Sequence, residues 1–441
     1  MAEFDLLLVA KLVVPDSTSR PLSPGFVAIR DSRIQVVGEG RPAGIAAQRK
    51  IVSKDGIIIP GLVSTHDHMY GVLAHGIPMD REIKGFLGFL EDFWWPRVEN
   101  RLGIEEVRAA VEVATVERLK SGTTCVADTL EAPNTIPGAL DAEAAVVERA
   151  GMRAILSFEA TERVSRENGR EGLKENASFV ARRNRNDGLV RGMHCLHTTF
   201  TCSPSFIRKC RADANASGAG IQIHLEESPY EGSHAAKKYH KTPVEVYNDL
   251  GFWGPDVIAS QCVQTAPEDI RTLAKHRVSV SHQPLSNGEV GGGIAPVPRM
   301  LEQGLAVGLG TDGFIVDMFE VMRGAWLLHK AASVDPSVLP ASQVFKMATE
   351  TGARILKTGA GAIKPGLKAD LVVLQDRFPT PVTIENAVTQ LVTFGSGRLV
   401  SDVVVDGKIA VRAGNTIHID ADSARRKGLK AAERLWSSPG R

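Results

Sequence analysis

The stretch from Ile57 to His68, which reads IIIPGLVSTHDH, decides how this chain is interpreted. Its continuous apolar run predicts a buried strand, and the polar tail that begins at Thr65 predicts that the C-terminal tip of this strand opens into a polar site. Residues two apart on a strand point to the same side, so His66 and His68 can bind one metal ion while Asp67 points elsewhere. An isolated His-x-His can equally be a pair of ordinary polar residues in a strand-to-loop turn.

Further strand-like runs end in side chains that could complete such a site. They end at His224, Gln261 and Asp312. Three neutral imidazoles and one carboxylate suit a divalent ion of the zinc or iron(II) type. For Asp312 alone, a turn aspartate in the loop after a strand is the competing interpretation. The combination with three histidines favours a metal ligand that also orients a water molecule.

Strand-like and helical patterns alternate through the middle of the chain. Amphipathic helices are predicted at 104–120 and 139–150. Eight strands separated by helices over roughly 300 residues are what a closed (β/α)8 barrel of the TIM type requires, and this α/β fold gathers catalytic groups at the C-terminal strand ends. The expected strands lie at 57–66, 122–128, 153–160, 190–200, 221–226, 257–263, 278–283 and 306–311.

Both ends of the chain are rich in short strand patterns, and Asp-Gly at 406–407 predicts a hairpin between two of them. Each end is too small for a core of its own. This predicts one discontinuous β-sandwich domain, built from 1–60 and 361–420, beside a catalytic barrel at 61–360. A C-terminal helix and tail are predicted at 421–441. The expected terminal strands lie at 5–14, 25–30, 34–37, 369–374, 391–394, 400–405 and 408–412.

The composition argues against several classes of protein. With 441 residues, 43% of them hydrophobic, the chain can bury a large core. Its 52 basic and 51 acidic residues give no reason to expect a nucleic-acid partner. The apolar run at the N-terminus is too short for a membrane span, so a cytoplasmic protein without a membrane partner is expected. Five widely spaced cysteines without a Cys-x-x-Cys pair indicate reduced thiols, and do not fit the zinc site of cytidine-type deaminases.

Glu227 is the expected proton carrier. It follows His224 by three positions in the run HLEE. If His224 binds a metal at the strand tip, Glu227 can reach a metal-bound water, whose pKa the metal lowers toward neutrality. A carboxylate there can take the proton and pass it to a leaving nitrogen. Glu227 is therefore the general acid/base in this interpretation.

Together these motifs resemble those of the amidohydrolase superfamily. They are similar in particular to its aminohydrolase and chlorohydrolase branch, which contains deaminases and triazine hydrolases with one catalytic metal. The resemblance extends over essentially the whole chain, and it is specific for the superfamily but not for a substrate. The matching segments are STHDH (64–68), HLEE (224–227), SHQPLSN (281–287), GLGTDG (308–313), KPGLKADLVVL (364–374) and VVVDGKIAVRAGN (403–415).

The resemblance implies roles for individual residues. It implies catalytic roles for Glu227 and His282, and substrate contacts at His197 and Asn287. A structural imidazole that anchors the loop is the competing role for His282. Relatives of this kind form homodimers or larger homo-oligomers, so such an assembly is expected. The implied cofactor is one divalent ion, zinc or alternatively iron(II), held by His66, His68, His224 and Asp312.

The chain departs from the family pattern on its sixth strand. Where relatives carry Ala-His-Cys-Val-His, this chain reads SQCVQ at 260–264. The usual histidine is therefore Gln261, which can form hydrogen bonds but cannot take up a proton near neutral pH. The replacement argues against a second metal ion. It suggests either a substrate held by the Gln261 amide or reduced activity.

An aromatic segment from Phe86 to Trp95 follows the first metal motif. It can be a lid or pocket wall over a planar heterocycle, to which Trp94 would contribute. It can also be a helix packed on the barrel or on a partner subunit.

Three further segments narrow the expected substrate. FEATER (158–163), FPTPVTIENAV (378–388) and TFGSGR (393–398) resemble a subgroup of aminohydrolases associated with purine breakdown, which implies a purine-like substrate. The expected function is metal-dependent hydrolysis of a carbon–nitrogen bond, as a deamination, in a small nitrogen heterocycle. The alternatives are ring opening of a cyclic amide or dehalogenation at the same site, and a catalytically weak barrel that binds a metal or ligand.

Overall fold

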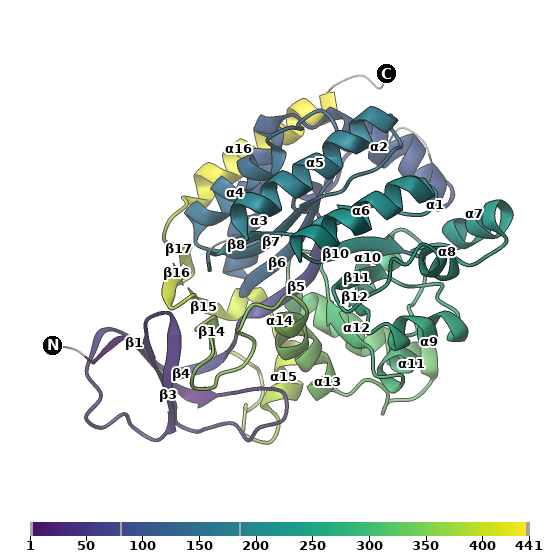
Figure 1. Cartoon of the computed structure of the whole chain (residues 1–441). Coiled ribbons are helices and arrows are strands. Elements are labelled where there is room, and N and C mark those ends of the chain that lie inside the picture. The colour runs from purple at the N-terminus through teal and green to yellow at the C-terminus, as the bar shows by residue number, and fades with distance from the viewer. Residues whose placement is uncertain (1–2, 80–81, 185–186, 438–441) are drawn as a thin grey trace.

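The computed structural model describes residues 3–79, 82–184 and 187–437, which form an α/β architecture (Figure 1). The strands are β1 Phe4–Val13, β2 Gly25–Arg30, β3 Arg33–Glu39, β4 Ala47–Pro60, β5 Leu62–Asp67, β6 Thr123–Leu130, β7 Arg153–Phe158, β8 Val190–Gly192, β9 His194–Leu196, β10 Ile221–Leu225, β11 Val257–Gln261, β12 Ser279–His282, β13 Ala306–Leu309, β14 Leu371–Gln375, β15 Val400–Val405, β16 Lys408–Arg412 and β17 Asn415–Thr416.

Helices separate most of the strands of the central region. The α-helices are α1 Gly85–Gly88, α2 Trp95–Arg97, α3 Ile104–Lys120, α4 Ala139–Ala150, α5 Arg166–Arg183, α6 Pro204–Ser217, α7 Pro229–Tyr239, α8 Pro243–Asp249, α9 Pro267–Lys275, α10 Pro284–Glu289, α11 Val297–Glu302, α12 Met318–Ser333, α13 Ala341–Lys346, α14 Gly352–Ile355, α15 Ala387–Phe394 and α16 Ala421–Ser437. The 3-10 helices are η1 Met69–Ala74, η3 Glu99–Arg101 and η5 Gly397–Leu399, and the π-helical segments are η2 Phe89–Trp94 and η4 Met347–Thr351.

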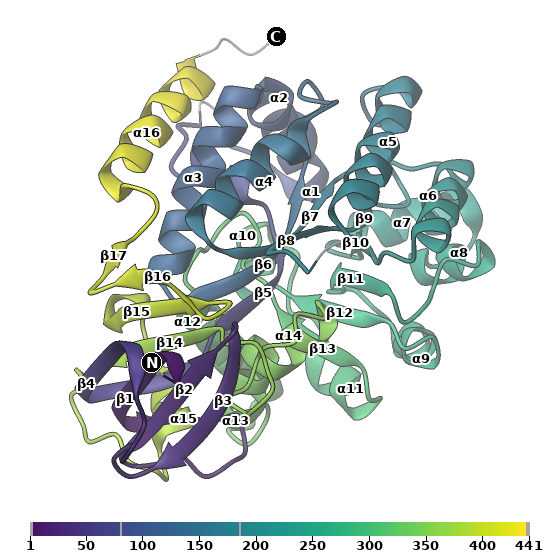
Figure 2. The ribbon, with the colours of Figure 1, turned by 60° about the vertical axis from the view of Figure 1, so that its left-hand side comes forward.

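Strands from both ends of the chain share one mixed sheet, with the order β17-β16-β15-β14-β4-β1-β2-β3. At the junction, β4 runs parallel to β1 and antiparallel to β14, and Leu371 lies opposite Pro60. Figure 2 shows the purple N-terminal strands beside β14, β15 and β16. Apolar residues from both chain ends, such as Leu8, Ile58 and Val404, form a core of their own here. Neither end could bury this core alone.

Two parallel sheets occupy the central region, with the orders β5-β6-β7-β8 and β13-β12-β11-β10-β9. Isolated parallel bridges connect these sheets at both edges, from Asp67 to Asp312 and from Ala160 to Leu196. The C-terminal ends of neighbouring parallel strands meet at the same edge of a sheet, which brings together the residues that follow β5, β10 and β13.

The stretch IIIPGLVSTHDH is divided between two sheets. Residues Ile57 to Pro60 end β4 in the mixed sheet, and β5 begins at Leu62 in the parallel sheet. The expectation of one continuous strand over 57–66 was therefore wrong. Gly61 occupies the break, where a Cβ atom would collide with the side chain of Thr124. The apolar run conceals this break because both halves are buried.

The predicted helices at 104–120 and 139–150 have the same bounds as α3 and α4. The predicted hairpin is confirmed: residues 406–407 connect β15 to β16, and both have the positive φ angles of a tight hairpin turn. The strand expected at 391–394 was wrong, because these residues form the last turn of α15. A run of four apolar residues is too short to show whether its period is that of a strand or a helix.

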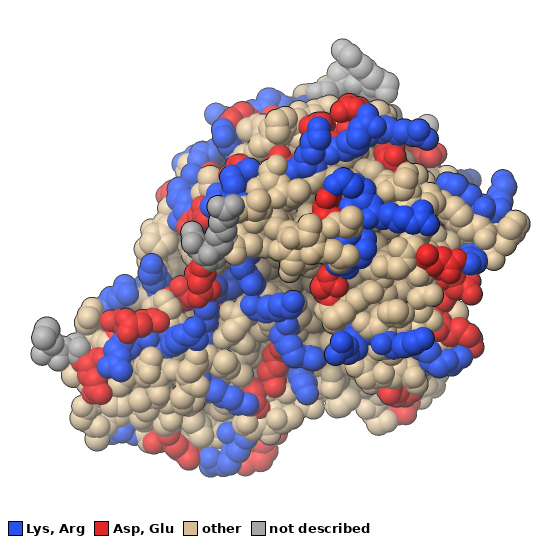
Figure 3. Space-filling model, viewed as in Figure 1, with Lys and Arg blue, Asp and Glu red and all other residues tan. Residues whose placement is uncertain are grey.

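The C-terminal helix α16 lies along α3, where Nζ of Lys427 donates a hydrogen bond of 2.8 Å to Oε1 of Glu112. Lysines and arginines are interspersed with aspartates and glutamates over the face seen in Figure 3. Within the described ranges, no helix combines the length and the apolar character needed to cross a bilayer. All five cysteines are buried and free.

Candidate active site

Three imidazoles converge at the C-terminal ends of β5 and β10. The Nε2 atom of His224 lies 3.2 Å from Nε2 of His66 and 3.2 Å from Nε2 of His68. Asp312 follows β13, and its carboxylate oxygens lie 3.8 Å from Nε2 of His66 and 3.6 Å from Nε2 of His68. Burial lowers the pKa of His66 and of His224 well below the usual value, which favours the neutral imidazole that binds metal ions. The three imidazoles could hold one divalent ion, and the carboxylate of Asp312 lies near enough to supply a fourth donor.

The outer nitrogens of these rings are held by neighbouring groups. Nδ1 of His68 lies 2.7 Å from the carbonyl oxygen of Thr129, and Nδ1 of His66 contacts the side-chain amide of Gln222. The carbonyl acceptor at Nδ1 of His68 fixes the tautomer that leaves Nε2 free for a metal. At His66 the amide nitrogen of Gln222 faces Nδ1, so a metal at Nε2 of His66 requires the amide to turn its oxygen to Nδ1. Gln222 was missed by the sequence analysis. Its position two residues before His224 on β10, and therefore on the same strand face, was the available signal.

Asp67 points away from the imidazoles, as the sequence predicted. Its carboxylate pairs with the guanidinium of Arg118 on α3, and Oγ1 of Thr311 donates a hydrogen bond of 2.7 Å to its Oδ2 atom. This side chain therefore fixes the position of the β5 tip from behind the histidines.

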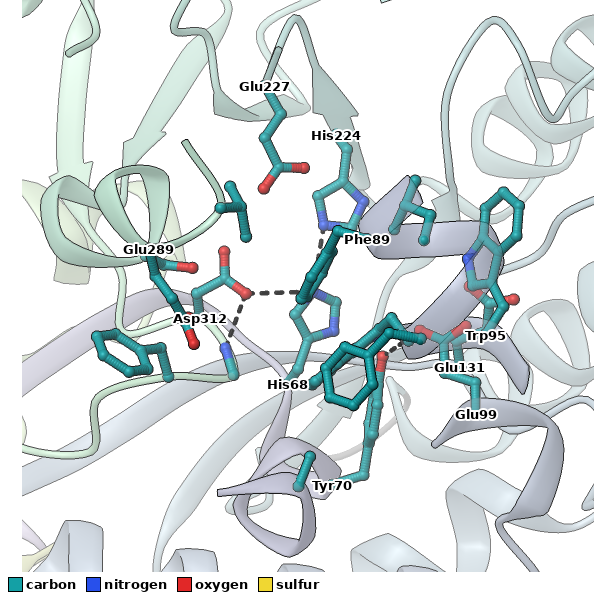
Figure 4. A pocket seen from close by; sticks show the side chains of 18 of the residues that line it. His68, Tyr70, Phe89, Trp95, Glu99, Glu131, His224, Glu227, Glu289 and Asp312 are labelled. Atoms are coloured by element: carbon teal, nitrogen blue, oxygen red, sulfur yellow. Dashed lines mark hydrogen bonds and ion pairs between the residues drawn. The ribbon is translucent and has the colours of Figure 1, made fainter. Parts of the chain in front are cut away.

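A cavity of about 460 Å³ lies beside the histidines and includes Glu227. Figure 4 shows Glu227 next to His224, with its carboxylate on the same side as Asp312. Burial raises the pKa of Glu227 well above the usual value, and the nearby carboxylates of Asp312 and Glu231 act in the same direction. A carboxyl group in this environment readily holds a proton, as a general acid must.

The aromatic segment forms one wall of this cavity, as the pocket-wall interpretation predicted. Phe89 and Trp94 line it, with their rings stacked at a centroid distance of 5.6 Å and an interplanar angle of 22°. Trp95 also lines the cavity and lies under the guanidinium of Arg163, at 5.0 Å from its ring centroid. Flat aromatic walls suit a planar ring system.

His197, which follows β9, also lines the cavity. Its Nδ1 atom lies 2.8 Å from Oγ1 of Thr201. Burial lowers its pKa to about 3, so the ring is neutral at physiological pH. With Nδ1 engaged, Nε2 is the remaining nitrogen, and it lies 3.6 Å from Oε1 of Glu159.

Comparison with known proteins identifies the family, because residues 57–410 match the Amidohydrolase family. The chain belongs to the amidohydrolase family. The 5'-deoxyadenosine deaminase of Methanosarcina acetivorans is 36% identical over 431 residues, which cover 97% of each chain. The 5-methylthioadenosine/S-adenosylhomocysteine deaminase of Pelotomaculum thermopropionicum is 34% identical, over 96% of this chain and 95% of the relative.

Among solved structures, an adenosine deaminase from Xanthomonas campestris with bound zinc is similar to this amidohydrolase at a TM-score of 0.89 and 25% identity, over 99% of both chains. The family membership predicted from the sequence is confirmed. The zinc of this relative and the cluster of three histidines both support the predicted divalent cofactor.

Three residues that were expected to act in catalysis or to contact substrate in this amidohydrolase do not line the cavity. Gln261 instead lies among the candidate metal ligands, where its Nε2 donates a hydrogen bond of 3.1 Å to Oδ2 of Asp312 and lies 3.3 Å from Nε2 of His66. Nε2 of His282 lies 3.0 Å from Nε2 of His329 on α12, which agrees better with the structural role considered for this imidazole. Asn287 is fully buried on α10.

Four glutamates of the cavity were missed by the sequence analysis, one of them Glu289 at the end of α10. Glu131 and Glu159 directly follow β6 and β7, and Glu99 begins η3. A usable signal was the position of Glu131 three residues after the strand expected at 122–128 and of Glu159 near the end of the strand expected at 153–160. Glu99 could not be found in this way, because it comes from a segment whose path across the site is set by tertiary contacts.

Proposed function

We propose that this amidohydrolase deaminates a purine-like substrate by hydrolysis, at a site where one divalent ion is bound by His66, His68, His224 and Asp312. The observation that carries the proposal is the convergence of three imidazoles and a carboxylate beside a cavity that also contains the carboxyl group of Glu227. The deaminase relatives, which align over nearly the full chain, support deamination among the hydrolytic reactions considered.

A divalent ion bound here supplies Lewis acidity and lowers the pKa of a water molecule. Glu227 takes the proton of the attacking water and delivers it to the departing nitrogen, so that an amino group leaves as ammonia and a carbonyl remains. The buried position of Glu227 favours the protonated form that is needed for the second half of this transfer.

His197 and the aromatic wall position the substrate in this proposal. Nε2 of His197 forms a hydrogen bond with a ring nitrogen, because Thr201 already occupies its Nδ1. Trp94 and Phe89 provide apolar faces for the ring system. Gln261 takes no part in proton transfer, since an amide does not titrate, and its hydrogen bond to Asp312 assigns it a positioning role.

The pairing of the strands also supports a proposal for the architecture of the chain. The parallel strands β5–β13 form one closed (β/α)8 barrel within 61–360, supported by the bridges at both sheet edges. The mixed sheet encloses its own core as a β-sandwich built from 1–60 and 361–420.

Ammonia release from adenosine, 5'-deoxyadenosine and guanine by the zinc-loaded protein tests the function. Glu227→Gln should reduce turnover by about 100- to 10,000-fold, the usual contribution of general acid–base catalysis, and should retain its zinc. Glu226→Gln is the matched control, because Glu226 is the adjacent glutamate and does not line the cavity. A Glu227→Gln variant with wild-type turnover, or a zinc-loaded wild type that releases ammonia from none of these purines, would contradict the proposal.

A further inference from the structure

The cavity has an acidic lining. Of the described residues that line it, six carry carboxyl groups, and none is a lysine or arginine. Figure 4 shows Glu99 and Glu131 on the side of His68 opposite to Asp312 and Glu289. We call Glu99, Glu131 and Glu159 the acidic end of the cavity. The carboxyl groups in the lining are Glu99, Glu131, Glu159, Glu227, Glu289 and Asp312.

The guanidinium nearest the acidic end is already engaged. The Nε atom of Arg163 donates to Oε1 of Glu131, and its Nη2 donates to Oε2 of Glu99 at 2.8 Å. Its Nη1 donates to Oδ1 of Asn100 at 2.8 Å. One guanidinium therefore pairs with two of the three carboxyl groups of the acidic end, and each of its nitrogens has a protein partner.

Two oxygens of the acidic end have no hydrogen-bond partner. Oε2 of Glu131 and Oε2 of Glu159 are both buried and unpartnered, on residues that are 1% and 2% exposed. Oε2 of Glu159 lies 3.4 Å from Nδ1 of His224, but the two atoms form no hydrogen bond. A buried carboxylate oxygen without a donor is costly, so Oε2 of Glu131 is an acceptor for a donor that a ligand brings into the cavity.

We propose that the acidic end selects substrates by charge, with Glu131 as the specificity-determining residue. It accepts hydrogen bonds from hydroxyl, amine or cationic groups and excludes substrates that carry a phosphate or carboxylate. The proposal rests on the deaminase function above and narrows its substrate to uncharged or cationic purine-like compounds. The physical cause is repulsion between like charges, which acts strongly where water is excluded. At the opposite side of the cavity Glu289 presents a further carboxyl group.

Four adenine nucleoside compounds that differ only at the 5' position of the ribose test this selection by charge. The kcat/KM of the zinc-loaded wild type is measured with adenosine, 5'-deoxyadenosine, adenosine 5'-monophosphate and adenosine 5'-carboxylate. We expect the two uncharged compounds to be preferred over the two anions by about 100-fold or more, mainly through KM, because like-charge contacts cost several kcal/mol. Glu131→Gln should reduce this preference for uncharged compounds over anions by about tenfold. The control Glu117→Gln, which changes an exposed glutamate on α3, should leave it unchanged.

The outcomes separate this inference from the deaminase function. Turnover of the monophosphate as fast as that of adenosine would overturn charge selection and leave the deaminase function intact. If no purine is deaminated, the function fails, and calorimetric binding of the same four compounds to zinc-loaded Glu227→Gln still decides charge selection. If Glu131→Gln does not fold, the ratio measured for the wild type decides the question.

Discussion

The Nε atom of Arg118 donates a hydrogen bond of 2.6 Å to Oδ2 of Asp67, and the two side chains are 1% and 0% exposed. A second hydrogen bond from Nη2 to Oδ1 makes the pair bidentate. Asp67 separates His66 from His68, so this ion pair ties the metal-binding tip of β5 to helix α3. Such a pair specifies the geometry of the motif from a position that no ligand reaches.

Breaking this pair should destabilise the whole fold. In Arg118→Met the carboxylate of Asp67 loses its counter-ion while it stays buried, which costs about 3–5 kcal/mol of unfolding free energy. Arg108→Met is the matched control, because Arg108 forms an exposed pair with Glu105 that contributes about 0.5 kcal/mol or less. Urea denaturation measures both. Equal stabilities of the two variants would contradict the role of the pair, and adding Asp67→Asn to Arg118→Met should recover part of the loss.

Gln222 should control metal affinity without touching the metal. In Gln222→Leu the Nδ1 atom of His66 loses its partner, and affinity for zinc should fall about 10- to 100-fold, as is usual when the outer partner of a ligating histidine is removed. Competition with a chromogenic chelator measures this affinity. The same substitution at Gln35, on β3 of the mixed sheet, should leave zinc binding unchanged. Unaltered affinity in Gln222→Leu would show that His66 is positioned by other groups.

Gln261 should act through Asp312 and not through the substrate. In Gln261→Leu the Asp312 carboxylate loses a hydrogen bond, and hydrogen bonds to charged groups contribute about 1.5–3 kcal/mol. We therefore expect zinc affinity and kcat to fall about tenfold or more, with little change in KM. A large rise in KM with zinc affinity unchanged would instead assign Gln261 to substrate binding.

The buried pair of His282 and His329 should make the fold sensitive to acid. Burial lowers the pKa of His329 to about 4, whereas a histidine in the unfolded chain titrates near about 6.5. Between these values the unfolded state binds the additional proton, so stability falls as the pH decreases from about 6.5 to about 4 and is constant with respect to this group below that.

The variant His329→Gln removes this titration. Its stability should depend less steeply on pH than that of the wild type, and the difference between the two proteins should change by about 1–3 kcal/mol between pH 7 and pH 4. Urea denaturation at several pH values measures this difference. Parallel stability curves for the two proteins would rule out the contribution of His329.

Local sequence patterns predicted the elements whose periodicity is long or whose turn chemistry is distinctive. The helices α3 and α4 and the hairpin at 406–407 belong to this group. The break at Gly61 was missed because apolar burial continues across it, and the last turn of α15 was too short to show a period. In both cases tertiary contacts determined the structure of a segment whose local sequence is compatible with more than one structure.

In the candidate site, too, local sequence patterns predicted some residues and could not predict others. The histidines, Asp312 and Glu227 follow strand-like runs in recognisable motifs, and the structure brings them together. Arg118 continues the buried face of α3, so a charge at that position was a signal of an internal partner. The contact of Gln261 with Asp312 joins residues 51 positions apart, and no local pattern contains such information.

The pairing of β4 with β14 also determines when the chain can finish folding. During synthesis the first strands emerge long before Leu371, which must lie opposite Pro60 in the complete sheet. Until then one edge of β4 has no neighbour, and open strand edges promote association between nascent chains. A ribosome that stalls before β14 is made would therefore leave an aggregation-prone product, and strands made late in synthesis protect those made first.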